Sequence, residues 1–163
     1  MKTYPSLSKI NFLNPTTEML VIQDIAHALS RITRFGGHTP WKRLYSVAEH
    51  SILVSQFLKS ELRLYGLLHD AAEAYMMDLP SPLKILLPEY KEIERRLEAK
   101  IFERFVGEQP SVEKWSIVKK ADVEAYDLER ARMENPGGAY QPATMESNVV
   151  QFLGFFNKYG GIE

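Results

Sequence analysis

The sequence has no cysteine among its 163 residues. This absence excludes disulfide bonds, thiolate metal sites, iron–sulfur clusters and cysteine nucleophiles. The sequence also lacks a strong charge of one sign, because 20 lysines and arginines stand against 21 aspartates and glutamates. A net charge of −1 provides no broad basic surface for the phosphates of duplex nucleic acid. We therefore expect no binding to long nucleic acid, and a smaller anion must be met by a local cluster of cations.

Long hydrophobic runs are also missing. The richest apolar stretch, 149–156, is interrupted by Gln151 and Gly154, and it is far shorter than the roughly 20 residues that span a bilayer. The segment Met1–Thr17 lacks the basic stretch, apolar core and cleavage site of a secretory signal. We therefore expect a soluble, cytoplasmic protein that does not associate with membranes.

Strand signals are scarce, whereas helical periodicity fills most segments between the prolines and glycines. The one short strand candidate, Met19–Ile22, is interpreted as the entry to a helix. The expected helices lie at about 24–34, 46–58, 62–77, from 88 onward, 111–133 and 145–157. Chains of about 100–200 residues usually fold around one core. The sequence therefore predicts an all-α, single-domain helical bundle over 1–163, with its core at about 22–134 and a C-terminal helix at about 145–157.

Local signals mark two of the helix ends. The sequence Ser46-Val47-Ala48-Glu49 is a capping box, in which the serine hydroxyl and the glutamate carboxylate each accept a hydrogen bond from a free backbone N–H. Gly160 follows the last periodic segment and is expected to stop the C-terminal helix.

Polar residues interrupt the most apolar of the expected helices. His69 and Asp70 are enclosed by Leu67-Leu68 and Ala71-Ala72, and Glu73 follows on the same side of the helix. His50, on the preceding helix, has apolar neighbours at its same-face positions and is expected to point inward. Buried polar side chains cost free energy unless they are paired or bind a metal. These positions are therefore the informative ones.

Two interpretations of the inward histidines compete. A lone core histidine is best interpreted as hydrogen-bonded to a carboxylate such as Asp70 or Glu49. For two inward histidines with two carboxylates in one helical turn, a metal ion offsets the buried polarity most readily, and the metal interpretation is favoured. Imidazole and carboxylate ligands without sulfur suit Mn²⁺, Co²⁺, Ni²⁺, Fe²⁺, Zn²⁺ or Mg²⁺, and the pattern does not choose among them.

A further carboxylate is expected from the fifth helix. Asp122 follows an apolar residue by four positions, and Tyr126 and Glu129 continue the same face. Asp127 is a competing candidate. Spacing alone favours Asp122 over Asp127 only modestly.

In this order, His50, His69-Asp70 and Asp122 resemble the H…HD…D signature of the HD-domain phosphohydrolases, a family of all-α metal enzymes. The sequence is most similar to the short 5′-deoxynucleotidase-like branch and its phage relatives, some of which are deoxynucleoside triphosphate triphosphohydrolases. The HD pair alone is a weak signal, but further segments match around it. The matching segments are Asp24–Arg31, Arg34–His38, Ser46–Ser51, His69–Tyr75, Asp78–Lys84 and Lys120–Asp122. The resemblance covers about Ile22 to Asp122, and the later residues carry no matching motif.

The resemblance implies one bound divalent metal ion. Its four implied ligands are His50, His69, Asp70 and Asp122. Glu73 is implied as the acid/base or water-positioning residue, with Asp78 assisting near the nucleotide. Because water attacks the phosphorus directly, no nucleophilic serine or threonine is needed.

The resemblance also implies residues that contact the substrate. Arg34 and Phe35 match a pair in which the arginine touches phosphate and the ring lies against the nucleoside, although close relatives often have tryptophan in place of Phe35. The glycines at 36–37 remove bulk near the base, and Gly37 is the implied contact there. Lys84 fits a phosphate contact, and Arg43 is weighed equally as a phosphate contact and as a solvated surface cation.

The expected activity is metal-dependent hydrolysis at the 5′ phosphate of deoxynucleotides. Two substrates remain open: a monophosphate that releases phosphate, or a triphosphate, for example dATP, that releases triphosphate. The alternatives are a non-catalytic nucleotide-binding or interaction protein and a cyclic-nucleotide phosphodiesterase. Homo-oligomerisation is expected from the family and from the apolar helix stripes.

Overall fold

Polar caps, prolines and glycines set the helix ends. The computed structural model describes residues 9–135 and 137–162. Along the chain it has η1 (Thr17–Met19), α2 (Ile22–Leu29), η2 (Arg34–Gly37), α3 (Val47–Phe57), η3 (Ser60–Leu62), α4 (Arg63–Leu68), α5 (Glu73–Met76), α6 (Ser81–Ile85), α7 (Pro88–Phe105), α8 (Val112–Glu134) and α9 (Met145–Lys158). The first eight residues, which belong to the segment predicted to lack a secretory signal, lie outside the described residues. In the described part, the one strand-like pairing is an isolated antiparallel bridge between Thr33 and Ser46.

The long helices begin at side-chain caps. The hydroxyl groups of Ser46, Ser111 and Thr144 accept hydrogen bonds from backbone N–H groups three residues later. α7 begins at Pro88, whose ring fits the first turn of a helix. α9 ends before Gly160, which has φ of 81°. The predicted stop at Gly160 is confirmed.

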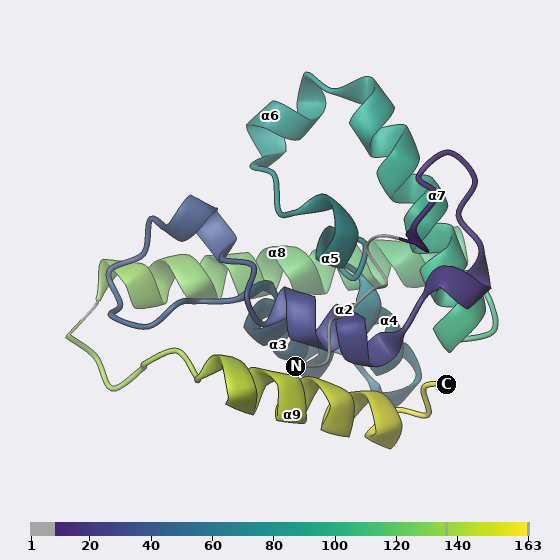
Figure 1. Ribbon diagram of the computed structural model, residues 1–163. Helices are drawn as coiled ribbons and strands as arrows, with labels where there is room; N and C mark the ends of the chain where they lie inside the picture. The colour runs from purple at the N-terminus through teal and green to yellow at the C-terminus, as the bar shows by residue number, and fades with distance from the viewer. Residues whose placement is uncertain (1–8, 136, 163) are drawn as a thin grey trace, which may run out of the picture.

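The helices pack around one apolar core, as the all-α prediction requires. α3 is central and packs against α2, α4, α8 and α9 (Figure 1). α4 lies close to α3 at Gly66, where an added Cβ would clash with Leu58 Cδ1 and lie 3.2 Å from the Cα of Ser55. A side chain there would force the Leu58 side chain and the α3 backbone to shift, so glycine keeps the backbone at Gly66 close to α3.

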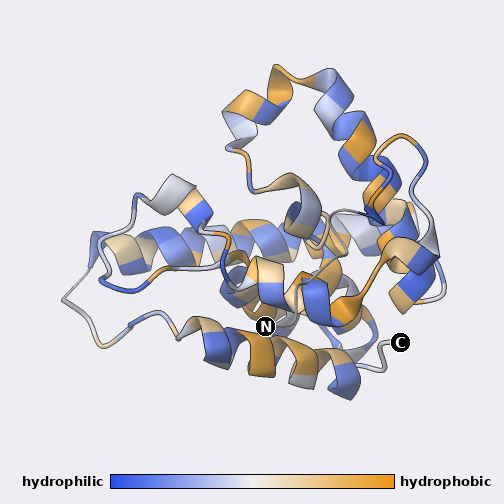
Figure 2. Cartoon of the chain, viewed as in Figure 1, coloured by the Kyte–Doolittle hydropathy of each residue, from blue (hydrophilic) through white to orange (hydrophobic). Residues whose placement is uncertain are grey.

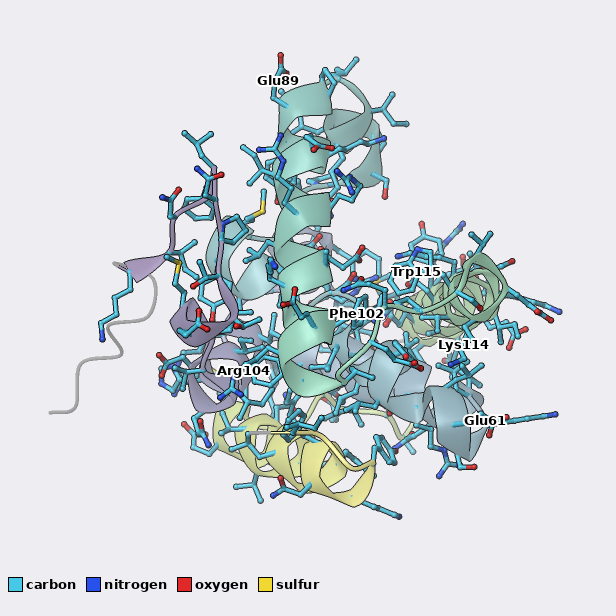
Figure 3. All side chains as sticks on the ribbon, turned by 90° about the vertical axis from the view of Figure 1, so that its right-hand side faces the viewer. Glu61, Glu89, Phe102, Arg104, Lys114 and Trp115 are labelled. Atoms are coloured by element: carbon cyan, nitrogen blue, oxygen red, sulfur yellow. The ribbon has the colours of Figure 1, made fainter. Side chains whose placement is uncertain are left out.

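α6 and the first half of α7 extend away from this core (Figure 1). Figure 3 shows Glu89 at the outer end of α7 and Phe102 near its inner end, where the Phe102 ring contacts Trp115 of α8 at 5.6 Å between centroids. Hydrophobic residues gather at the outer turn between α6 and α7 (Figure 2), where Ile85 and Leu86 are exposed. No helix in the described residues is both long and apolar enough to cross a membrane.

The expected continuous helix at 62–77 is wrong. α4 ends at Leu68 and α5 begins at Glu73, and the turn between them has hydrogen bonds to the third preceding carbonyl, such as Glu73 N to Asp70 O at 3.0 Å. Three-residue spacing aligns side chains at i and i+3 more closely than an α-helix does. The break therefore places Asp70 and Glu73 on one side of the chain.

Two other expectations need correction. The first predicted helix, 24–34, is found at Ile22–Leu29, because Ser30 and Arg31 side chains donate to the His27 carbonyl and the chain turns. The capping box is only half formed. The hydroxyl of Ser46 caps the helix, but the carboxylate of Glu49 instead accepts hydrogen bonds from Tyr140, Ala143 and Asn148.

Candidate functional site

Three elements bring the expected metal ligands together. His50 comes from α3, His69 and Asp70 from the turn after α4, and Asp122 from α8. Ligand atoms of His50, His69 and Asp122 lie within 4.8 Å of one another, a grouping that could hold a metal ion. Asp70 adjoins them, with its Oδ2 3.1 Å from His69 Nε2 and 3.6 Å from His50 Nε2. The exposed Asp127 lies outside this cluster.

The far side of each imidazole ring is fixed by an acceptor. His50 Nδ1 is hydrogen-bonded to the carboxylate of Glu129, and His69 Nδ1 lies 2.8 Å from the carbonyl oxygen of Gly66. A histidine that donates through Nδ1 presents the lone pair of Nε2 to a metal. His69 Nε2 is buried without a hydrogen bond of acceptable geometry. This orphaned nitrogen and the oxygen-and-nitrogen donor set fit a divalent cation.

Charges within the cluster shift the pKa values of its members. Burial alone would lower the pKa of His69, but the charges of Asp70 and Asp122 outweigh burial and raise that pKa to about 10. Burial opposes ionisation of the two aspartates, yet the neighbouring histidines hold the pKa of each carboxyl far below its usual range. The cluster therefore strongly favours a positive charge at its centre.

Glu73 lies beside the cluster at the wall of a cavity of about 740 Å³. The residue is 3% exposed, and its Oε1 is 3.1 Å from Lys84 Nζ. Its other oxygen is buried without a hydrogen-bond partner. Burial, together with the charges of Asp70 and Asp78, raises the pKa of Glu73 to about 9. A carboxyl perturbed in this way inside a cavity is a candidate for proton transfer.

Cations from distant segments surround the same cavity. They are Arg34, Lys84, Lys91 and Lys119. Arg34 lies 3.7 Å from Asp70, and Lys84 also pairs with Glu94 at 2.8 Å. Arg43 does not line the cavity; its guanidinium donates to the carbonyl of Pro142. The expected cations Arg34 and Lys84 are therefore joined by two lysines that the sequence did not single out.

One edge of the cavity is aromatic. Phe35 and Tyr126 line it, with ring centroids 6.0 Å apart. Phe35 has φ of 56°, a left-handed conformation that is unfavourable for a bulky residue and is often retained at functional sites. Gly36 lines the cavity, whereas Gly37, the expected contact, does not. Asp78 is also at the cavity wall.

A second cavity of about 260 Å³ reaches His69 and Asp70 from the side of α7. Lys84, Lys91 and Lys119 line both cavities, Arg95 lines the second, and the carboxylates of Glu94 and Glu98 line the second beside them. The cluster is therefore bordered by cations on two sides.

The sequence placed Glu129 on the face of Asp122, but it predicted no role in the site for this residue. It is fully buried and contacts His50, Tyr45 and Arg34. The available signal was its position seven residues after Asp122, which places both on one face of α8. That spacing predicts the common face, but the partners His50 of α3, Tyr45 and Arg34 of η2 could be known only from the fold.

Comparison with known proteins gives three relatives, and no family model matches the chain. Over 137 residues the chain is 42% identical to the uncharacterized protein YfdR of Escherichia coli, an alignment that covers 80% of this chain and 74% of YfdR. An uncharacterized protein of Rhodobacter capsulatus is 37% identical over 105 residues, which are 60% of this chain and 54% of that protein. A 5′-deoxynucleotidase of Vibrio vulnificus is 29% identical over 140 residues, or 75% of this chain and 63% of the relative.

Proposed function

The chain belongs to the same protein family as YfdR of Escherichia coli, and we propose that this chain is a metal-dependent phosphohydrolase with one HD-type domain over 1–163. Its substrates in this proposal are deoxynucleotides, which it hydrolyses at the 5′ phosphate. The observation that carries the proposal is the cluster of His50, His69 and Asp122, with Asp70 adjoining it, beside the buried Glu73. The distant Vibrio relative, named a 5′-deoxynucleotidase, supports the same reaction class.

In this proposal the four clustered side chains hold one divalent cation. When bound, such an ion acidifies water and offsets negative charge on the phosphoryl group. The charge of a cation held by the cluster would offset the negative charge of Asp70, which adds to burial in raising the pKa of Glu73, so that Glu73 is ionised in the loaded site. Glu73 then takes a proton from the attacking water at its partnerless Oε2 and returns a proton to the leaving oxygen. Asp78, whose pKa is raised mainly by burial, assists from the same cavity wall.

The cavity lining supports a substrate with an anionic end and an aromatic end. In this proposal Arg34 and Lys84, which line the cavity, contact phosphate oxygens, which charged donors bind strongly. Phe35 and Tyr126 offer an apolar edge on which a nucleoside can lie. The presence of both linings in one cavity, where Arg34 lies over the Phe35 ring at 5.3 Å, favours a nucleotide over inorganic phosphate.

Two phosphate chain lengths have separate support. The name of the Vibrio relative favours a deoxynucleoside monophosphate. Lys91 and Lys119, which line both cavities, favour a longer phosphate chain such as that of a deoxynucleoside triphosphate.

The test is product analysis with the metal-loaded full chain. The protein is incubated with Mn²⁺, Co²⁺ or Mg²⁺ and each deoxynucleoside mono- or triphosphate, ribonucleotide and cyclic nucleotide, and phosphate is separated from triphosphate among the products. Release of either product from deoxynucleotides supports the proposal and identifies the chain length. Nucleotide binding without turnover under all three ions overturns it.

A further inference from the structure

Glu129 is fully buried, and its carboxylate forms hydrogen bonds with three other side chains. Its Oε1 accepts from Tyr45 Oη at 2.8 Å and bonds to His50 Nδ1, while its Oε2 accepts from Arg34 at 3.4 Å. Burying a carboxylate is costly unless donors satisfy its oxygens. A role in positioning its partners explains why a carboxylate is buried at this place beside the cluster.

The contact with His50 bears on which nitrogen of that ring carries the proton, because Nδ1 lies against Glu129 and Nε2 lies 3.1 Å from Asp122 Oδ1. His50 has no exposed surface, so its ring has little freedom to turn. With its proton on Nδ1 and directed to Glu129, the lone pair of Nε2 faces Asp70 and Asp122. A carboxylate behind a histidine in this way fixes its tautomer and the orientation of its ring as a metal ligand.

The carboxylate of Glu129 also reaches the cavity wall through its hydrogen bond with Arg34. Arg34 lies between Glu129 and Asp70 and has a side chain that is 12% exposed. Oε1 of Glu129 therefore bonds to His50 of the cluster, and Oε2 bonds to Arg34 at the cavity wall. The two contacts join the metal side of the site to its phosphate side.

We propose that Glu129 is the positioning residue of this site: it fixes His50 for metal binding and holds Arg34 in place at the cavity wall. The inference rests on the proposed metal centre, but it concerns metal affinity and ring tautomer and not the identity of the substrate.

The test compares Glu129→Gln with Glu49→Gln in the full chain. Glu49 is also a hydrogen-bonded glutamate, one residue before His50, but its partners are Tyr140, Ala143 and Asn148, away from the cluster. Calorimetric titration with Mn²⁺ alone is expected to show affinity about 10- to 100-fold weaker for Glu129→Gln, and unchanged affinity for Glu49→Gln. The absorption spectrum of bound Co²⁺ is expected to change only for Glu129→Gln.

A measurement on the unaltered chain covers the case in which Glu129→Gln does not fold. Nitrogen-15 imidazole NMR with Zn²⁺ bound is expected to show the His50 proton on Nδ1. Unchanged Mn²⁺ affinity in folded Glu129→Gln, or a His50 proton on Nε2, overturns the positioning role and leaves the proposed function standing. Failure of the unaltered chain to bind Mn²⁺, Co²⁺ or Zn²⁺ overturns both, whereas metal binding without nucleotide turnover overturns the proposed function alone.

Discussion

The proposed site has a side that would hold the metal and a side that would hold the substrate, and the two are built on differently packed parts of the molecule. The metal side belongs to α3, α4 and α8, where His50 and His69 are at most 3% exposed. The substrate side includes residues 77–90, here termed the arm, which carries Asp78 and Lys84. Leu86 of the arm is 73% exposed, and α6 packs against α7 (Figure 1). The arm is thus supported by few buried contacts.

This difference separates two demands on an enzyme site. Ligands of a metal must be held closely in place, and packed helices with fixed side chains meet that demand. Groups that admit substrate and release product are commonly drawn from segments of low local stability. The hydroxyl of Tyr90 donates to the carbonyls of Met76 and Met77, which anchors the base of the arm. We therefore expect local opening of the arm without loss of the metal cluster.

The largest expected effect is on the metal side. Asp70→Ala removes a carboxylate oxygen that lies beside both histidines, and we expect more than about 100-fold weaker metal binding, since loss of an outer partner alone costs about 10- to 100-fold. Activity should fall below detection with it. Metal content and titration measure the effect, with the exposed Asp127→Ala as the control. A full equivalent of metal in Asp70→Ala would show that the ligand assignment is wrong.

Glu73 lies at the boundary of the two sides, because its Oε1 contacts Lys84 of the arm. Glu73→Gln keeps the shape of the side chain but removes its acid/base function, so kcat should fall by about 10²- to 10⁴-fold. Metal affinity should remain within a few-fold of the unaltered chain. Steady-state kinetics and metal titration measure the two effects separately. Parallel loss of metal and rate would instead place Glu73 among the ligands.

The sequence predicted most of the helices that carry the metal side, because the signals that mark helix ends are local. Ser111, Pro88 and Gly160 mark helix ends through hydrogen bonds and backbone preferences that involve only near neighbours. The break at 69–72 could not be predicted, because its residues are all compatible with a continuous helix and tertiary packing sets the three-residue spacing.

Contacts over long sequence separation were also beyond prediction. Glu129 lies 79 residues after its partner His50, and Glu49 lies 91 residues before Tyr140. The capping-box pattern assigned Glu49 to its own helix end, although in the fold distant donors compete successfully for the carboxylate. Similarly, the convergence of Lys91 and Lys119 depends on how α7 crosses α8 and has no local signal.

The free energy of unfolding should distinguish the packed helices from the arm without any measurement of activity. Leu67 of α4 is fully buried in the core, and Leu67→Ala should lower the free energy of unfolding by about 2–5 kcal/mol. Denaturant titration followed by circular dichroism measures this change in the metal-free chain. A loss below about 1 kcal/mol would mean that the core around α4 can collapse onto the space left by the side chain.

The smallest effect is expected at the matched position in the arm. Leu86→Ala removes the same atoms as Leu67→Ala, but the side chain is 73% exposed, so the free energy of unfolding should change by no more than about 0.5 kcal/mol. Denaturant titrations at two protein concentrations measure the change. A larger loss that grows with protein concentration would mean that a second copy of the chain covers Leu86, because only association makes stability depend on concentration. A larger loss at both concentrations would mean that the arm packs as tightly as the core, and the contrast between the two sides of the site would not hold.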